Sequence, residues 1–401
     1  MSSVGDCSVT KHLSQVTKES LWASGSLKWT EAGPGRLGAG AAEMDFGVPP
    51  PVTATLVDAV NRGLFGYLPA AVETGLREAC AAWQFEQYGW QVAPNDVRVL
   101  PDVVRGLHVA VEHFSRPDSA VIVPTPAYTP FLTVPRLLGR EVIEVPLRED
   151  GTGGWTYDLD ALDDAYAGGG HLLVLCNPHN PVGRVLNIDE LRAITAVVER
   201  HRGRVFSDEI HAPITYPGHR HIPYASTSAQ AADHSVTAVS ASKAWNLAGL
   251  KCAQMLLSND ADRERWAHLG RLATDGASTL GALAGTAAYR QGRTWLDECL
   301  AQLDENRSRL GDLLKGLPGV RYTAPEGTFL GWLDFRQTEL PPHGLAEFFD
   351  ALAGVTVVDG SDCGRAGTGF VRLNFATAPQ ILEHIVERMA EAMRQAKRTS
   401  P

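Results

Sequence analysis

The chain of 401 residues is long enough for two or more domains with a sizeable core. Hydrophobic residues make up 44% and charged residues 20%, as in ordinary soluble globular enzymes, and the net charge of −10 argues against nonspecific nucleic-acid binding. No apolar run approaches the roughly 18 residues of a membrane span, and the polar N-terminus lacks a signal-peptide pattern.

The first two regions of the chain differ in their patterns. Residues 1–48 are rich in Gly, Ser and Ala with few periodic apolar positions, so we expect an arm or a contribution to a small domain there. From 49 to 285, short apolar runs alternate with helical patterns, which is typical of a large α/β domain with a mostly parallel sheet. The runs occupy residues 97–100, 121–123, 172–175, 205–206 and 236–239.

The pattern changes again in residues 286–401. A helical stretch at 294–314 precedes strand-like runs at 328–335 and 369–375, and an amphipathic helix follows at 381–393. This order predicts a smaller α+β domain, which we expect to pack with the 1–48 arm.

Neither the cysteines nor the histidines point to a disulfide framework or a metal. The six cysteines are scattered with no close pair, which predicts reduced thiols in a cytoplasmic protein. His211, His219 and His221 lie close together in the sequence, but they have no further ligand at metal spacing. We therefore expect no metal site.

Chemically suggestive residues follow the predicted strands. Ligands of open α/β sheets bind beyond the carboxyl ends of the strands, so one shared site is the economical interpretation. The residues that follow strands are Tyr128 after 121–123, Asn177 and Asn180 after 172–175, Asp208 after 205–206, and Ser240, Ser242 and Lys243 after 236–239.

Lys243 is the strongest candidate for a residue that binds an aldehyde cofactor. Small hydroxyl residues flank it in Ser240-Ala241-Ser242-Lys243, directly after an apolar strand. A lysine with a lowered pKa can form a Schiff base and can also move protons. Asp208 could keep a pyridine nitrogen protonated, although a strand-end aspartate can also simply cap the next turn. Together they predict pyridoxal 5′-phosphate (PLP) chemistry.

A cofactor phosphate would need donors and positive charge. Ser240 and Lys251 lie three residues before and eight residues after Lys243, so both could turn toward one anion. A helix that begins near Val103 would add backbone N–H groups, such as those of Val103 and Val104. Taken singly, the serine is also explained as a solvated hydroxyl and Lys251 as a surface charge.

Three further residues suit the ring and the substrate. Tyr128, on a Pro-rich turn, could stack on the ring, or it could be a packed core tyrosine. Asn180 could hydrogen-bond the ring oxygen, or it could belong to a simple Asn-Pro turn. Arg372, on an apolar strand-like run, suits a substrate carboxylate, with an internal ion pair as the alternative.

Together these motifs resemble the fold-type I PLP enzymes of the aminotransferase class I/II superfamily. More narrowly, the chain resembles the MalY/PatB group of cystathionine β-lyases and cysteine-S-conjugate β-lyases. The segments that carry the resemblance are Lys28-Trp29, Glu43-Met44-Asp45-Phe46, Phe65-Gly66-Tyr67, 177–184, 207–211, His221-Ile222-Pro223, 240–250 and Val371-Arg372-Leu373-Asn374.

The resemblance implies a fold and a role for each site residue. The fold would be a mostly parallel, seven-stranded-type sheet in the large domain (49–285), beside a smaller α+β domain built from 1–48 and 286–401. The implied roles are Lys243 as the Schiff-base lysine, Asp208 at the pyridine nitrogen, Asn180 and His211 near the ring oxygen, Tyr128 on the ring, Ser240, Ser242 and Lys251 with Val103 and Val104 at the phosphate, and Arg372 at the substrate carboxylate. Tyr67 would reach the phosphate of a neighbouring subunit, which implies a homodimer with shared sites.

The sequence departs from the group's pattern at two notable positions. Glu43 replaces the usual aspartate of Ala-Asp-Met-Asp-Phe, and Asp102 stands where a phosphate-loop glycine is expected. A carboxylate beside a phosphate is unfavourable unless it turns away to cap the helix.

The leading hypothesis is a PLP-dependent carbon–sulfur β-lyase that cleaves cystathionine or another cysteine S-conjugate to a thiol, pyruvate and ammonia. An aminotransferase on the same scaffold is the alternative. A specialised enzyme of secondary metabolism that eliminates from, or oxidatively decarboxylates, an S-substituted cysteine is a further option. A regulator that retains PLP without turnover is disfavoured, because no basic DNA-binding extension precedes the enzyme-like region.

Overall fold

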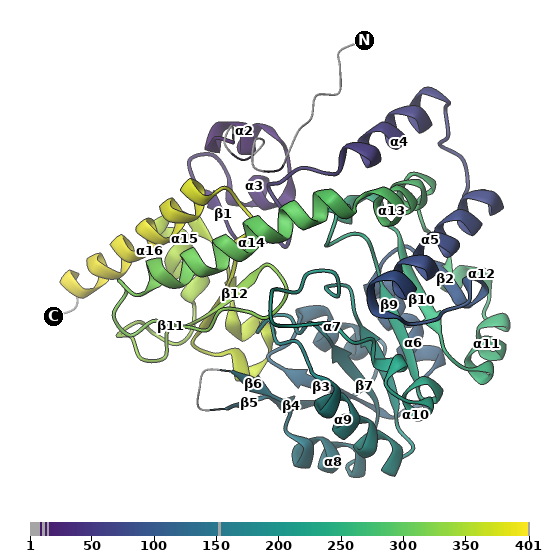
Figure 1. The fold of residues 1–401 in the computed structure, drawn as a ribbon. Helices are drawn as coiled ribbons and strands as arrows, with labels where there is room; N and C mark the ends of the chain where they lie inside the picture. Colours follow the sequence, from purple (N-terminus) through teal and green to yellow (C-terminus); the bar gives the residue numbers. More distant parts are fainter. Residues whose placement is uncertain (1–8, 10–12, 14–15, 151–153, 400–401) are drawn as a thin grey trace.

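The computed structural model describes residues 9, 13, 16–150 and 154–399, and within them a seven-stranded sheet forms the centre of the molecule (Figure 1). Its order is β2-β10-β9-β8-β7-β3-β4, and every neighbouring pair is parallel except those that β10 makes with β2 and β9. The strands are β2 (Val97–Leu100), β3 (Ala120–Thr125), β4 (Val142–Pro146), β7 (Gly170–Cys176), β8 (Arg204–Asp208), β9 (Ser235–Val239) and β10 (Ala253–Leu257).

The predicted fold class is confirmed, and all five predicted runs are strands of this sheet. Strands β4 and β10 were not predicted. The β10 run Ala253-Gln254-Met255-Leu256-Leu257 consists of good helix formers, so a short apolar run of this kind does not identify a strand. Strand β4 lies at the sheet edge and ends in Pro146, which weakens the strand signal.

Helices cover both faces of the sheet because the strands are apolar on both sides. Val121 and Val123 pack in the cluster that contains α6 and α7, whereas Ile122 packs in the cluster that contains α8 and α9. Helices α4 and α5 pack against α13. The bounds are α4 (Pro50–Asn61), α5 (Ala70–Tyr88), α6 (Val103–His113), α7 (Thr129–Leu137), α8 (Leu159–Ala167), α9 (Ile188–Arg200), α10 (Ala229–Asp233), α11 (Asp260–Ala267), α12 (Arg271–Thr274) and α13 (Thr279–Gln291).

The C-terminal part contains the predicted helix, two strands and amphipathic helix. The two strands belong to a four-stranded antiparallel sheet of order β11-β12-β15-β14, and the two helices accompany this sheet. The bounds are β11 (Arg321–Tyr322), β12 (Leu330–Asp334), β14 (Val358–Asp359), β15 (Phe370–Asn374), α14 (Arg293–Leu314), α15 (Leu345–Ala353) and α16 (Pro379–Thr399), with β5 (Arg148–Glu149) and β6 (Trp155–Thr156) paired apart from both sheets. The division of the chain at residues 48 and 285 stays a prediction.

The N-terminal segment packs beside the C-terminal elements, as Figure 1 shows for its purple and yellow parts. Strand β1 (Leu37–Gly38) pairs in parallel with β13 (Val355–Thr356). The segment also contains α2 (Lys18–Ala23) and α3 (Leu27–Ala32), which its sequence pattern did not indicate. Both helices are too short for a periodic signal. Among the described helices, none has a stretch of the length and apolarity that crossing a bilayer requires.

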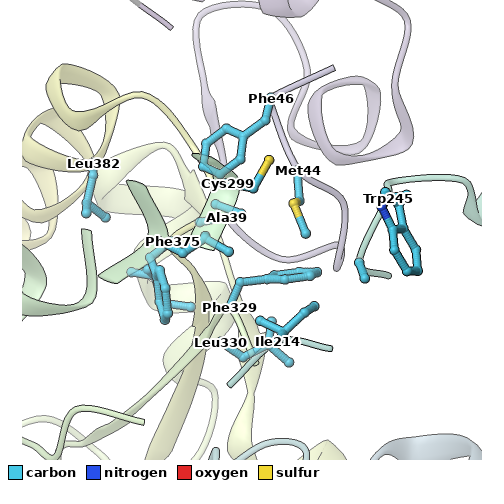
Figure 2. Close-up of a cluster of buried hydrophobic side chains, with 14 of the residues drawn as sticks. Ala39, Met44, Phe46, Ile214, Trp245, Cys299, Phe329, Leu330, Phe375 and Leu382 are labelled. Carbon is cyan, nitrogen blue, oxygen red and sulfur yellow. The ribbon is translucent and has the colours of Figure 1, made fainter. Parts of the chain in front are cut away.

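The largest apolar cluster joins the N-terminal segment to the rest of the protein. Met44 and Phe46 lie near Phe329 and Phe375 in this cluster, and Trp245, two residues after Lys243, is buried in it too (Figure 2). The apolar surface removed from water therefore holds residues 39–46 against the segment that carries Lys243.

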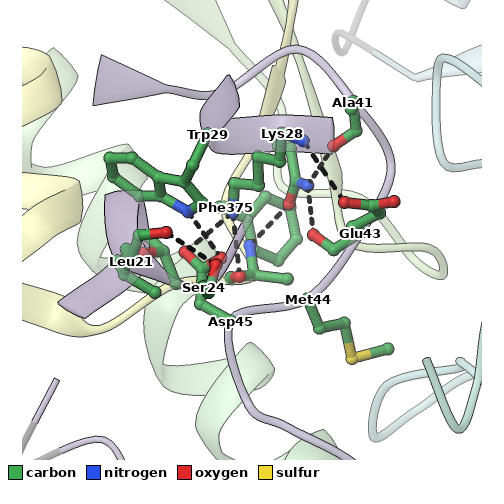
Figure 3. Close-up of polar contacts among 12 residues, drawn as sticks. Leu21, Ser24, Lys28, Trp29, Ala41, Glu43, Met44, Asp45 and Phe375 are labelled. Atoms are coloured by element: carbon green, nitrogen blue, oxygen red, sulfur yellow. Dashed lines mark hydrogen bonds and ion pairs between the residues drawn. The ribbon is translucent and has the colours of Figure 1, made fainter. Parts of the chain in front are cut away.

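A buried ion pair fixes the same segment. Lys28 Nζ lies 2.9 Å from Asp45 Oδ2, and their side chains are 0% and 3% exposed (Figure 3). Asp45 Oδ1 accepts a hydrogen bond from Trp29 Nε1 at 2.9 Å, and Lys28 Nζ also donates to the carbonyl of Ala376 at 3.2 Å. The pair is thus hydrogen-bonded on both sides, as a buried ion pair must be to offset its desolvation.

We expect Asp45→Asn to lower the free energy of unfolding by about 3 kcal/mol, because it leaves the Lys28 ammonium buried without its counter-ion. Urea denaturation followed by circular dichroism would measure the change. The matched control is Asp58→Asn, which removes an exposed pair with Arg62 and should cost less than about 1 kcal/mol. Equal effects of the two substitutions would contradict this account.

Candidate active site

A cavity of about 560 Å³ opens at the carboxyl ends of the parallel strands. The loops after β3, β7, β8 and β9 border it, and residues 40–43 and strand β15 close it from the other side. Every predicted site residue except Tyr67 and Asn177 lines this cavity. These residues are Val103, Val104, Tyr128, Asn180, Asp208, His211, Ser240, Ser242, Lys243, Lys251 and Arg372.

Lys243 lies in the turn after β9, and its amine is held by the N-terminal segment. Nζ donates a hydrogen bond to the carbonyl of Ala42 at 3.1 Å, and part of the side chain faces the cavity. Enclosure by protein, reinforced by the positive charge of Arg372, lowers the pKa of the Lys243 amine to about 8. About a tenth of this amine is therefore neutral, and nucleophilic, at pH 7.

Asp208 ends β8 and is buried. Its Oδ1 accepts the backbone N–H of Ile210 at 3.0 Å, so it does form the local turn contact that the alternative interpretation expected. Burial raises the pKa of the carboxyl group to about 7, an effect opposed by this hydrogen bond and by Lys243. A buried acid with a raised pKa is ready to pair with a cation that enters the cavity.

His211 is buried in the cavity wall as a neutral imidazole. Burial, together with the charges of Lys243 and Arg372, lowers the pKa of its ring to about 3. Its Nδ1 has no hydrogen-bond partner among the described residues, and its ring meets Phe329 edge-to-face at 5.9 Å. An unpaired buried nitrogen of this kind favours a polar ligand nearby.

Arg372 lies in the middle of β15 and is 7% exposed. Its Nη1 donates to Asn180 Oδ1 at 3.3 Å, its Nη2 donates to the carbonyl of Gly40 at 3.2 Å, and its Nε has no partner in the described chain. The structure shows no ion pair of Arg372 with a described residue, so the internal ion pair considered from the sequence is not observed. Burial lowers the pKa of the guanidinium, and a carboxylate ligand would relieve that desolvation.

Tyr128 precedes α7 and faces the cavity, with its ring edge-to-face against Phe131 at 5.5 Å. Burial raises the pKa of its phenol. The residue combines a cavity-facing ring with packing on Phe131, and its stacking on a cofactor ring stays a prediction.

The predicted phosphate residues gather at the N-terminus of α6. Ser240 Oγ donates to the carbonyl of Cys252 at 2.7 Å and accepts the N–H of Ser242 at 3.0 Å. Lys251 Nζ lies 2.9 Å from Asp102 Oδ2, while Asp102 Oδ1 accepts the N–H of Arg105 at 2.7 Å. Asp102 therefore caps the helix, as expected for a carboxylate at this position.

Tyr67 lies outside this cavity and is 91% exposed. It borders a second hollow together with Phe65, which is 67% exposed. Its predicted contact with a phosphate would therefore require the site of another subunit.

Several contacts of the site were not predicted, because a sequence does not show which backbone carbonyl groups accept hydrogen bonds from side chains. Residues 41–44 are fixed by two asparagines: Asn374 Nδ2 donates to the carbonyls of Ala41 and Glu43, and Asn246 bonds both backbone groups of Met44. Glu43 was noticed only as a departure. It lines the cavity, and its carboxylate accepts the N–H of Lys28 at 3.3 Å (Figure 3).

The residues considered for a metal are separated in the structure. His221 pairs with buried Glu209 at 3.0 Å, while His211 lines the cavity. Within the described residues, no group of three or more His, Cys, Asp or Glu side chains could hold a metal ion. Cys80, Cys176, Cys252, Cys299 and Cys363 are free thiols, and Cys7 lies outside the described residues.

The donor set fits PLP. A nucleophilic lysine, a buried acid and an aromatic ring line one cavity, and the free N–H groups of a helix N-terminus open onto it. The orphaned nitrogen of His211 provides a further polar contact.

Comparisons with known proteins agree with this arrangement. The family model for aminotransferase class I and II matches residues 36–389. The cystathionine beta-lyase of Corynebacterium glutamicum is 40% identical over 92% of this chain and 96% of its own. The cystathionine beta-lyase PatB of Bacillus subtilis is 32% identical over 94% and 98%. The crystal structure of cystalysin from Treponema denticola, which contains a pyridoxal 5′-phosphate cofactor, has a TM-score of 0.88 and 28% identity over 96% of this chain and 99% of that one.

We expect the modification rate of Lys243 in the cofactor-free protein to rise with pH and to reach half its maximum near pH 8, since only the neutral amine reacts. An ordinary lysine would reach this point near the reference pKa of about 10.4. Mass spectrometry after brief reductive methylation would follow each lysine separately. In Arg372→Gln the midpoint should move to higher pH, because a nearby positive charge is removed; an unchanged midpoint would contradict the coupling.

Proposed function

The chain belongs to the aminotransferase class I and II family, and from this membership we propose that it is a PLP-dependent carbon–sulfur β-lyase. It would cleave cystathionine or another cysteine S-conjugate to a thiol, pyruvate and ammonia. The observation that carries the proposal is the meeting of Lys243, Asp208 and Arg372 in one cavity of a chain that resembles cystathionine β-lyases over most of its length.

Each cavity residue has a place in this proposal. When bound, PLP supplies an aldehyde that bonds covalently to amines and a ring that accepts electrons from the substrate Cα. Lys243 would hold the cofactor, Asp208 would lie at its ring nitrogen, Asn180 and His211 at its ring oxygen, and Tyr128 on its face. Ser240, Ser242, Lys251 and the N–H groups of Val103 and Val104 would bind its phosphate.

The protein's own groups then bind the substrate and move protons. Arg372 offers a buried guanidinium to the substrate carboxylate, which orients Cα toward Lys243. The neutral Lys243 amine takes the Cα proton and acts as general base, for which a pKa of about 8 is well matched. The thiolate leaves from Cβ, and uptake of water converts the remaining three-carbon fragment to pyruvate and ammonia.

We also propose a homodimer in the cytoplasm. Tyr67 and Phe65, which border one hollow, and Val57 and Val60 of α4 are large apolar side chains left exposed in a single chain, and a second copy could cover them. Tyr67 would complete the partner's phosphate site. The cytoplasmic location rests on the free thiols of the described cysteines.

Incubation of the purified holoenzyme with cystathionine or S-alkyl cysteines should release pyruvate and thiol in equal amounts without any keto-acid acceptor. Lactate dehydrogenase coupling and a thiol reagent would measure the two products. The matched variant Lys243→Ala should lose at least about a thousandfold in turnover, because the base and the covalent tether are both removed.

Two results would redirect the assignment. Amino transfer that depends on a keto acid, with no pyruvate from cystathionine, would favour the aminotransferase alternative. Robust turnover by Lys243→Ala would refute the role of this lysine. The role would then fall to Lys251, the only other lysine that lines the cavity in the described part of the chain.

Co-expression of Tyr67→Ala with Lys243→Ala should restore activity that neither variant has alone, because half of the random dimers then contain one intact site. The expected recovery is about a quarter of the unaltered activity. Sedimentation would report the oligomeric state, and purification with two different tags would isolate the mixed dimers. Mixed dimers without activity would contradict shared sites.

A further inference from the structure

The N-terminus of α6, where the cofactor phosphate would bind, has less net positive charge than the presence of Lys251 suggests. Three cations of the described chain line the cavity, and of these Lys251 alone contacts the N-terminus of α6. Its ammonium lies 2.9 Å from Asp102 Oδ2 in a partly exposed pair. The two charges cancel, so the net charge that an incoming anion meets here is close to zero apart from the helix dipole.

Asp102 is held where it is by the helix it caps. Its Oδ1 accepts the N–H of Arg105 at 2.7 Å, and its backbone carbonyl accepts the N–H of Gly106 at 3.2 Å. The carboxylate therefore stays beside the N–H groups of Val103 and Val104, on which an anion would settle.

The Ser240 hydroxyl is already engaged in hydrogen bonds within the protein, so it is a weaker phosphate donor than its position suggests. Its hydroxyl proton is directed to the carbonyl of Cys252 at 2.7 Å, and its oxygen already accepts the N–H of Ser242 at 3.0 Å. A hydroxyl has one proton to donate, so Ser240 can donate to a phosphate only by giving up the bond to Cys252.

We propose that Asp102 limits the affinity of this site for the cofactor phosphate, both by competing for Lys251 and by repelling the phosphate directly. The inference rests on the proposed function and concerns how firmly the cofactor is retained. In this protein the cofactor is held chiefly through its covalent bond to Lys243 and through helix N–H groups, and it exchanges readily with the free pool when that bond opens.

The substitution Asp102→Asn distinguishes the charge of the carboxylate from its role as the N-cap of α6. Asparagine is as good a helix cap as aspartate, so α6 stays capped while the carboxylate charge disappears. Asp102→Ala, which removes both, is the matched control for the cap. Equilibrium dialysis of the full chain against PLP, and against pyridoxal, which lacks the phosphate, gives the dissociation constants without any measurement of turnover.

We expect Asp102→Asn to bind PLP about tenfold more tightly than the unaltered protein and to bind pyridoxal equally well. In a Lys251→Gln background the gain should shrink, because no ammonium remains to be released. An unchanged or weaker affinity for PLP, or an equal gain for pyridoxal, would overturn the role of Asp102. Failure of the unaltered protein to bind either compound would instead refute the proposed function, and the inference would fall with it.

Discussion

The chemistry of the cavity depends on the removal of a few ionisable groups from bulk water. Enclosure brings the pKa values of Lys243 and Asp208 to about 8 and about 7, so that both groups can change protonation state near neutrality. In open solvent the same lysine would stay charged and the same acid would stay ionised. Burial thus sets the two pKa values, and residues 40–43, which line the cavity, contribute to that burial.

The covering segment is held by three different kinds of contact. A buried ion pair fixes Asp45, side-chain amides of Asn246 and Asn374 bond its backbone, and Met44 and Phe46 anchor it in the largest apolar cluster. Such redundancy explains how an irregular stretch can enclose charged groups firmly enough to shift their pKa values. It also links stability to function, since any change that loosens the segment admits water to Lys243.

Much of the site was visible in the sequence because it follows one rule: polar residues after parallel strands meet at one edge of the sheet. This rule selected Tyr128, Asn180, Asp208 and Lys243, which all line one cavity, and also Asn177, which does not. Arg372 was singled out by its apolar neighbours, and the resemblance to a known family added His211 and Tyr67. What the sequence could not provide was the set of bonds that backbone carbonyls make, such as Ala42 with Lys243 and Gly40 with Arg372. Strand β10 was missed because its residues favour a helix locally, and its pairing on both sides outweighs that preference.

The reversed direction of β10 has a mechanical consequence. Strand β9 ends at the cavity edge, and the antiparallel strand β10 begins there. The single loop 240–252 between them therefore carries both Lys243 and Lys251. The spacing between Lys243, the proposed covalent tether, and Lys251, the proposed anion-binding residue, is therefore set by one short stretch of chain, in which Lys251 has a left-handed backbone with φ of 49°. An insertion between Lys243 and Lys251 would change this spacing, whereas residues 40–43 and β15 on the opposite wall can vary without altering it.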